Sequence, residues 1–579
     1  MAVRLHNSMD NATRGRRALR AWEDSKPENF FTADTNLQNV LRYYLGDTAY
    51  NAAQKRLAEL GADAARHLDP DARLEDQLGN HPRLERWTGI GERVEEIVFH
   101  PVHHRTGELV WRSGVLALQE LPGRTVEQMG LYYLLAHNGE GGHLCSIACT
   151  SGLIRALQQA AAIEVREQFL PPLLRRDFDD MQHGAQFLTE VQGGSDVGAN
   201  SVIARPNGDG TWRISGEKWF CSNVNADQFL MTARPEGAPE GTRGLGLFLV
   251  PRRLFDGSVN GFSIRRLKDK LGTRTLASAE LDFDNALAYP VGPLDRGFKN
   301  TVELVLNTSR LLNAVACAGI MRRAYIEAST YACQREAFGA AIISYPLVQE
   351  ALADILSEYY AATASGFYLA HLLDQIETGR ANGDEGGLYR LLVSANKYIT
   401  SVRASEAVHR AIEVLGGNGA IESFSVLPRL YRDMVVLESW EGTHNVLCLQ
   451  VLRDIARFDL HLPYERAMRA LLADVTSIEL AESVQAVGAA LDRVRAALLR
   501  LNRGGDRYAQ AHARRFTDLL MQTAQAALLL AEAQREIDRG LRTPKRDALA
   551  HFIARHLRPG SDLLDDPNYL ARIERLAGQ

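Results

Sequence analysis

The chain has 579 residues, of which 46% are hydrophobic and 24% charged, and its formal net charge at pH 7 is −5. At roughly 150 residues per domain, this length predicts three or four domains with large buried cores. The near balance of charge excludes a polyelectrolyte that binds nucleic acid over its whole surface. Six scattered cysteines without a CxxC pair favour a reducing compartment, so we expect a cytoplasmic protein.

No run of 18 apolar residues occurs in the sequence, so no membrane-spanning helix is expected. The first 20 residues contain five arginines but lack the apolar core of a secretory signal. A mitochondrial presequence is the alternative, and Asp10 and Asp24 argue against it.

Residues 1–35 are polar and are expected to be irregular. From Asn36 to about Phe178, apolar residues recur at spacings of three and four, which predicts a helical domain over residues 1–183. Between residues 184 and 292 the pattern changes to short alternating runs such as TWRISGEKWF and ASAELDFD, separated by turns such as NGDG. This second region is expected to form a small antiparallel barrel or sandwich.

Helical periodicity returns at about Phe298 and continues to the end of the chain. A break near HLPYE (461–465) divides this half into a helical bundle over residues 293–460 and an additional helical domain over residues 461–579. The expected order of domains is therefore α, β, α, α, a multidomain α+β chain.

The segment RDMVVLESWEGTHNV (432–446) places a carboxylate, Glu441, after an apolar stretch and Trp440. Gly442 gives the backbone freedom to turn, and Thr443 is suited to cap the next helix. A glutamate held against an indole in a cavity has its pKa raised from ~4.3 toward neutrality, where it can act as a general base. The alternative is that Glu441 only adds a negative charge at a helix N-terminus.

Four other segments have the composition of a ligand site. LTEVQGGSD (188–196) is a loop in which backbone N–H groups and hydroxyls can approach a flat polar ligand. GEKWFCSN (216–223) places an aromatic pair beside the hydroxyl of Ser222. CQREAFG (333–339) ends a helix, and LGGNG (415–419) is a glycine turn fit for contact with phosphate or adenine. Each segment alone is more often a turn or a cap than a site.

Other ligand motifs are absent from the sequence. No GxGxxG follows a predicted strand and no GxxxxGK occurs, so neither a Rossmann dinucleotide site nor a P-loop is supported. HPVHH (100–104) has no carboxylate or cysteine partner at ligand spacing, and no metal site is expected.

Taken in this order, the segments resemble those of the flavin-dependent acyl-CoA dehydrogenase superfamily, and the AidB-like (adaptive alkylation-response) branch most closely. The branch-level resemblance rests on WFCS, RLKDKLGTRTLASAELDF (266–283), PRLYRDM (428–434) and WEGTHNVLCLQVLR (440–453). It covers residues 30–460 and implies an α / β-barrel / α-bundle fold with an extra C-terminal helical region.

The resemblance implies a bound FAD. Residues along the flavin and its pyrophosphate would be Leu188, Thr189, Gly194, Ser195, Phe220, Ser222, Thr443 and Asn445, with the Ser222 hydroxyl near the reactive N5. Arg335, Phe338, Gly416 and Gly417 would reach the FAD of a neighbouring subunit. A shared cofactor implies a homo-oligomer, and the family suggests a tetramer built as a dimer of dimers.

The resemblance also implies a reaction, the α,β-dehydrogenation of an acyl-CoA or other acyl thioester. Glu441 matches the base that removes the α-proton, while the β-hydride passes to flavin N5. Arg310 and Trp440 match substrate-binding positions, and an electron-transfer flavoprotein is the implied electron acceptor. The indole of Trp440 stands where tyrosine is usual, and Phe220-Cys221-Ser222 replaces a Trp-Ile-Thr pattern. These departures question ordinary straight-chain fatty acyl-CoA as the substrate more than they question the flavin.

The AidB-like branch offers a different function, a flavoprotein of the alkylation-damage response that binds duplex DNA and has weak or incidental dehydrogenase activity. The stretch 491–515 holds seven arginines against two aspartates, and Arg493, Arg495, Arg500 and Arg503 are candidate phosphate contacts. A solvated helix face is the alternative explanation. A non-catalytic scaffold is disfavoured because Glu441 and the flavin positions are intact, whereas an oxidase or a carrier-protein-dependent desaturase is not distinguished.

Overall fold

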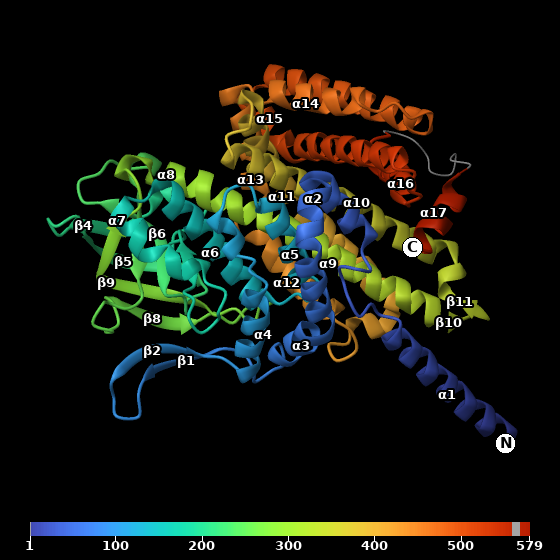
Figure 1. The fold of residues 1–579 in the computed structure, drawn as a ribbon, viewed down its shortest axis with the longest axis horizontal. Helices are drawn as coiled ribbons and strands as arrows, with labels where there is room; N and C mark the ends of the chain where they lie inside the picture. Colours follow the sequence, from blue (N-terminus) through green and yellow to red (C-terminus); the bar gives the residue numbers. More distant parts are fainter. Residues whose placement is uncertain (1, 559–567) are drawn as a thin grey trace.

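The computed structural model describes residues 2–558 and 568–579. A β-barrel occupies one end of the molecule, long helices run from it through the centre, and the last helices form a further layer above them (Figure 1). The predicted fold class, helical region, β-barrel, helical bundle and extra C-terminal helical region, is confirmed.

The N-terminal region is mainly helical. Its main helices are α1 (Ala2–Asp24), α2 (Thr35–Asp63), α3 (Asp69–Glu75), α4 (Pro101–Arg112), α5 (Thr125–Ala136), α6 (Gly141–Ala160) and α7 (Ile163–Phe169). The expectation that residues 1–35 are irregular is wrong, because α1 is helical and extends away from the body in Figure 1. A second difference is a hairpin of β1 (Arg83–Trp87) and β2 (Arg93–Val98) inside a region predicted to be helical.

The β region consists of β3 (Gly184–Phe187), β4 (Ile203–Pro206), β5 (Trp212–Ser222), β6 (Gln228–Pro235), β7 (Gly246–Pro251), β8 (Phe262–Leu267) and β9 (Ser278–Pro290). The pairing β6–β4–β5–β9–β7 closes on itself through β6–β7, which makes the sheet a barrel. Alternating inward residues such as Phe187, Phe229 and Phe248 fill its own core. The long β5–β9 pairing brings Ser222 opposite Ser278.

The bundle is formed by α8 (Gly297–Asn300), α9 (Asn307–Gln334), α10 (Pro346–Glu377), α11 (Gly383–Leu415), α12 (Leu427–Ser439) and α13 (His444–Phe458). A short hairpin of β10 (Glu336–Ala337) and β11 (Ala340–Ala341) follows α9. Among the described residues, one segment, Leu294–Gln334, is long and apolar enough to cross a membrane. Its most apolar 18-residue window is 89% buried, as in a core helix of the bundle, and α9 packs against α5, α10 and α11.

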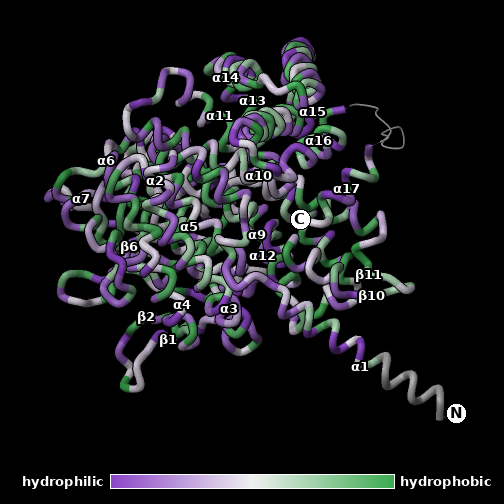
Figure 2. The backbone as a smooth tube through the Cα atoms, turned by 45° about the vertical axis from the view of Figure 1, so that its right-hand side comes forward, coloured by the Kyte–Doolittle hydropathy of each residue, from purple (hydrophilic) through white to green (hydrophobic). Residues whose placement is uncertain are grey.

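The additional region contains α14 (His461–Ala473), α15 (Ala481–Asp538), α16 (Lys545–His556) and α17 (Tyr569–Ala577). Helix α13 ends at Asp459, which has a left-handed backbone conformation. The sequence HLPYE then forms the first turn of α14. Within α15 the backbone leaves the helical conformation at Gly505, where φ is 76°. Hydrophilic and hydrophobic residues interleave along these outer helices in Figure 2, as expected for helices with one buried face.

Candidate active site

Glu441 lies in the turn between α12 and α13. Its backbone has φ 59°, a left-handed conformation that residues other than glycine rarely adopt. The Nε of Arg310, on α9, donates to the carbonyl oxygen of Glu441 at 3.0 Å. Burial raises the pKa of the Glu441 carboxyl to about 7, although Arg310 and Lys397 each favour its charged form. This turn therefore presents a carboxylate that can accept a proton near neutral pH.

Trp440 forms one wall beside Glu441. Its indole packs with Cys145, Cys149 and Leu276, which are all buried. Within the described part of the chain, the indole Nε1 is buried and has no hydrogen-bond partner. The wall is therefore apolar and carries one spare donor, the combination that orients a ligand in a mostly apolar pocket.

The loop after β3 lies against the end of β5. The backbone N–H of Trp219 donates to the carbonyl of Thr189 at 2.9 Å, which joins the two segments. A Cβ at Gly194 would come within 2.5 Å of the Thr189 hydroxyl, so this approach requires glycine. Phe220 is 55% exposed at the strand end, while Gly194 and Ser195 lie open to solvent. Leu188, Thr189, Gly194, Ser195, Phe220 and Ser222 thus form one surface.

A hydrogen-bond chain connects this surface to the Trp440 wall. The hydroxyls of Ser222 and Ser278 lie 2.9 Å apart, and the Nζ of the half-buried Lys270 donates to Ser278 at 3.0 Å. Lys270 also donates to the carbonyl of Leu276, the residue that packs on Trp440. The barrel surface and the Glu441 turn are therefore neighbours in one site.

Arg335, Phe338, Gly416 and Gly417 lie elsewhere. Arg335 and Phe338 follow the far end of α9, about 35 Å along the helix from Arg310. Gly416 and Gly417 begin the turn whose Asn418 donates to Tyr331, one helical turn before Arg335. Phe338 is 99% exposed and has φ 52°. Arg335 and Phe338 therefore lie at the β10–β11 hairpin, Gly416 and Gly417 lie in a turn near the same end of α9, and Arg310, which contacts Glu441, lies toward the other end of that helix.

Thr443 and Asn445 begin α13. Thr443 occupies the N-cap position, but its side chain makes no capping hydrogen bond, so the expectation that it caps this helix is wrong. Asn445 accepts a hydrogen bond at 2.9 Å from Arg514 of α15. The additional C-terminal region therefore touches the segment that carries Glu441.

The basic stretch of α15 is largely on the surface. Arg495, Arg500 and Arg503 are exposed, and Arg500 and Arg503 lie close to the break at Gly505. Arg493 differs, because it is half-buried and donates to the carbonyl of Leu557 at the end of α16. Three of the four predicted phosphate contacts thus face solvent, and the fourth holds two helices together.

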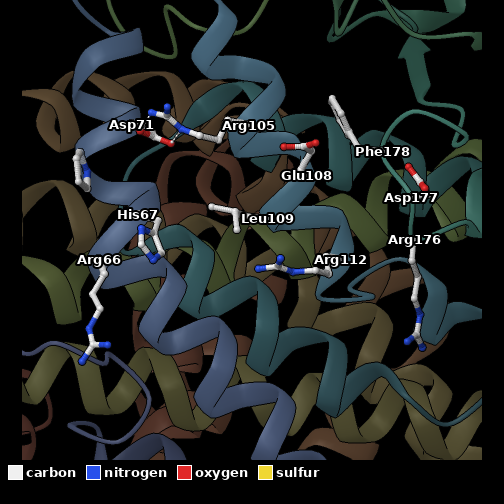
Figure 3. A pocket seen from close by; sticks show the side chains of 11 residues that line it. Arg66, His67, Asp71, Arg105, Glu108, Leu109, Arg112, Arg176, Asp177 and Phe178 are labelled. Carbon is white, nitrogen blue, oxygen red and sulfur yellow. Dashed lines mark hydrogen bonds and ion pairs between the residues drawn. The ribbon is translucent and has the colours of Figure 1, made fainter.

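A large surface pocket of about 730 Å³ lies in the N-terminal region and contains none of the predicted site residues. Figure 3 shows its arginines and carboxylates around α4. Arg105 pairs with Asp71, Arg112 with Asp63 and Arg66 with Glu28. Because these cations already have acidic partners, the pocket offers less free positive charge than its arginines suggest. No group of three or more His, Cys, Asp or Glu able to hold a metal occurs in the described residues.

Two residues of the site have no counterpart in the sequence predictions. Lys397, on α11, is fully buried, and its Nζ donates to the carbonyls of Glu438 and Gly442 at 2.9 and 3.2 Å. Gln186, on β3, donates to the Ser309 hydroxyl at 2.9 Å, and its own buried Oε1 has no partner among described residues. Both sit inside regular elements, where no local pattern marks them, so only the fold reveals them.

Three family models match successive parts of the chain. The adaptive response protein AidB N-terminal domain matches residues 21–180, the acyl-CoA dehydrogenase middle domain residues 185–286, and the acyl-CoA dehydrogenase C-terminal domain residues 295–456. The chain is also 34% identical, over 391 residues, to AidB of Escherichia coli (strain K12). That alignment covers 65% of this chain and 69% of the relative.

Solved structures show the same architecture. Caenorhabditis elegans ACDH-11 in complex with C11-CoA superposes with a TM-score of 0.86 and 28% identity, covering 93% of each chain. An acyl-CoA dehydrogenase from Bacillus anthracis complexed with FAD has a TM-score of 0.72 over 92% of this chain and 94% of its own. At 18% identity the second structure supports the fold alone.

Proposed function

Because the chain belongs to the acyl-CoA dehydrogenase family, with an AidB-type N-terminal domain, we propose that it is an FAD-dependent oxidoreductase acting on an acyl thioester. The reaction is α,β-dehydrogenation, in which a proton leaves the α-carbon and a hydride leaves the β-carbon. The single observation that carries this proposal is the Glu441 carboxyl, held beside the barrel surface with a pKa raised to about 7.

The residues present fit a bound flavin. Phe220 is an exposed aromatic ring at the end of β5, two residues before Ser222, so this strand end offers a flat face and a hydroxyl group. The exposed Gly194 and Ser195 leave backbone N–H groups open for a pyrophosphate. A bound FAD would supply the hydride acceptor, and the protein supplies alignment and electrostatics. Leu188, Thr189, Gly194, Ser195, Phe220 and Ser222 would hold it.

The chain's own residues perform the proton transfer. Glu441 takes the α-proton on its carboxylate, and a pKa near neutrality lets it be ionised before the reaction and protonated after it. Trp440, Cys145 and Cys149 form an apolar wall on one side of that carboxylate, which limits its contact with water and strengthens its interaction with the substrate. Arg310 is already bonded to the Glu441 carbonyl, so we assign it to holding the turn as well as to the predicted substrate contact.

An acyl-CoA is the proposed substrate class, supported by the C11-CoA bound to the C. elegans neighbour. The test is an anaerobic titration of the holoenzyme with short-, branched- and long-chain acyl-CoAs, following loss of flavin absorbance. We expect at least one acyl-CoA to bleach the flavin stoichiometrically. If none does, the enzymatic proposal is wrong. Electron-transfer flavoprotein is the proposed acceptor, and the cytoplasm the proposed location.

A homo-oligomer is proposed from the separation of the two groups of flavin residues. Arg335 and Phe338 lie too far from Glu441 for both groups to contact one FAD within a single chain. A neighbouring chain that brings its hairpin to the barrel surface would complete the cofactor site, and a dimer of dimers would satisfy all four sites. Sedimentation of the holoenzyme tests this arrangement, and a monomer that binds FAD fully would contradict it.

DNA binding is the second candidate function, favoured by the exposed arginines near Gly505. Contacts to phosphates would make the affinity fall steeply with salt. A gel-shift series on duplex DNA should show weaker binding by a triple variant, Arg495→Ala, Arg500→Ala and Arg503→Ala, than by wild type. The variant Arg493→Ala is the matched comparison, because its side chain bonds Leu557. Equal binding by wild type and the triple variant would remove this candidate.

A further inference from the structure

The turn that carries Glu441 is held by side chains from two other helices. Asn313, on α9, donates to the carbonyl of Leu437 at 3.1 Å. Arg310, also on α9, donates to the carbonyl of Glu441, and Lys397, on α11, donates to those of Glu438 and Gly442. One buried ammonium group thus joins the backbone on both sides of the proposed base.

The conformation of Glu441 requires such support. A left-handed φ is unfavourable for a residue with a Cβ, because the Cβ comes too close to the backbone. Glu441 holds φ 59° although Gly442, with φ 110°, follows it directly. The surroundings therefore impose this backbone, and with it the direction in which the carboxylate leaves the turn.

We propose that Lys397 is a positioning residue for Glu441, which fixes the turn through the carbonyls of Glu438 and Gly442 and places a positive charge beside the carboxylate. The inference rests on the proposed role of Glu441 as the base. It adds a residue that does not touch the substrate but decides where the base points and how readily it is ionised.

A purely structural role would not require a charge. The last carbonyls of α12 need donors, and a neutral side chain could provide them, as Asn313 does for Leu437. Burying an ammonium group is unfavourable unless strong acceptors surround it. Lys397 is nevertheless fully buried, and no ion pair of Lys397 is formed among the described residues. The charge is explained if it serves the nearby Glu441 carboxylate.

The groups that face Glu441 are known from each neighbouring element. Arg310 comes from α9, Lys397 from α11 and Cys145 from α6, and Cys317 of α9 faces Lys397 itself. On the flanks of the turn, Glu438 and His444 lie 3.5 Å apart. Of these groups, Arg310 and Lys397 favour the charged carboxylate, so removal of the Lys397 charge should raise the pKa of Glu441.

The test compares Lys397→Met, Lys397→Gln and Lys397→Arg as holoenzymes. Lys397→Met removes donor and charge, Lys397→Gln retains a donor, and Lys397→Arg retains the charge. We expect Lys397→Met to bleach the flavin ~100-fold more slowly than wild type, because the base is misplaced. The midpoint of its pH–rate profile should move to higher pH. Lys397→Arg should restore the midpoint, with the rate only partly recovered.

Two further measurements keep the result interpretable. Asn313→Ala removes a neutral donor from the same turn and should lower the melting temperature without moving the midpoint. Infrared difference spectra, corrected with Glu441→Gln, report ionisation of the Glu441 carboxyl without turnover. If Lys397→Met does not fold, a wild-type midpoint in Lys397→Gln overturns the proposal. A Lys397→Met enzyme that folds and has the wild-type rate and pH midpoint also overturns the proposal.

Measurements on Glu441→Gln separate the proposed role of Glu441 as the base from the proposed role of Lys397 in positioning it. If Glu441→Gln bleaches the flavin as fast as wild type, the proposed function of Glu441 is wrong, and the role of Lys397 falls with it. If Glu441→Gln is inactive while Lys397→Met and Lys397→Gln behave as wild type, only the inference about Lys397 is wrong.

Discussion

The Glu441 turn and the β10–β11 hairpin are built in opposite ways. In the turn, carbonyls of Leu437, Glu438, Glu441 and Gly442 all accept hydrogen bonds from side chains of α9 and α11. At the hairpin, Phe338 is 99% exposed. A Cβ at Gly416 or Gly417 would meet no atom within 4 Å. The backbone carbonyls of the Glu441 turn thus have their hydrogen-bond partners within the chain, whereas the hairpin exposes Phe338 to solvent.

The difference separates two requirements of the proposed reaction. The proposed proton-accepting group lies in a turn that contacts within one chain hold, so its orientation does not depend on a contact from another subunit. The second group of proposed flavin contacts is exposed, as expected for a surface that another molecule covers. Changes in the turn should therefore alter the rate, and changes at the hairpin should alter cofactor retention and assembly.

The largest expected effect comes from the turn. Glu441→Gln removes the base while keeping the shape of the side chain, and flavin bleaching should slow by about 10⁴-fold. FAD content should stay at the wild-type level, because the proposed flavin surface lies on the barrel and not in the Glu441 turn. Stopped-flow absorbance with the best acyl-CoA measures the rate. A variant that loses FAD together with activity would show that the two regions are not separable in this way.

The hairpin should give the converse result. Arg335→Ala with Phe338→Ala should weaken FAD binding by roughly 10- to 100-fold, because an aromatic contact and a cation are lost. Equilibrium dialysis measures the affinity, and sedimentation measures assembly in the same samples. The bleaching rate of the fraction that retains FAD should match wild type. Full FAD affinity in this double variant would exclude the hairpin from the cofactor site.

A smaller effect is expected on stability. The pKa of Glu441 is about 7 in the folded protein and ~4.3 in an unfolded chain, so ionisation favours unfolding as pH rises between these values. Above pH 7 Glu441→Gln should be more stable than wild type by about 1–2 kcal/mol, since solvent at the partly buried carboxyl reduces the full effect. At pH 4 the two should unfold alike. Denaturant unfolding at both pH values measures the difference in free energy of unfolding between the two proteins. A difference that does not change with pH would contradict this prediction.

The smallest effect concerns Thr443. Loss of a capping hydroxyl normally destabilises a helix by about 1 kcal/mol. Because this hydroxyl makes no capping bond, Thr443→Ala should change the free energy of unfolding by less than about 0.5 kcal/mol. Denaturation of the apoprotein measures the change. A loss near 1 kcal/mol would restore the capping role that the sequence suggests.

The sequence predicts the order of helical and β regions because each type repeats its period over many residues. It does not reveal the β1–β2 hairpin. The RLERW strand is largely exposed, the RVEEIV strand has a single buried residue, and both are rich in charge, so neither has a buried alternating face. The polar composition before residue 36 also conceals helix α1. The β1–β2 hairpin and helix α1 form without a strong apolar pattern of their own, so the sequence pattern does not predict them.

The sequence predicts only those residues of the candidate site that have a distinctive local sequence around them. Glu441 stands out because Trp440, Gly442 and Thr443 surround it in the sequence. Lys397 does not, because it lies in the middle of α11 and meets the turn only after α11 and α12 pack together. The separation of Arg335 and Phe338 from Glu441 follows from the length of α9, which spacing along the sequence leaves undecided.

The central claim is that Glu441 is a base tuned by its burial and its two neighbouring cations. The most direct test is the pH dependence of anaerobic flavin bleaching by wild type and Glu441→Gln. The carboxylate is the active form, so the wild-type rate should rise with pH through a midpoint near the pKa of about 7. The residual rate of Glu441→Gln should lack that midpoint. A midpoint near the ordinary carboxyl pKa of ~4.3, or the same profile in both proteins, would contradict the claim.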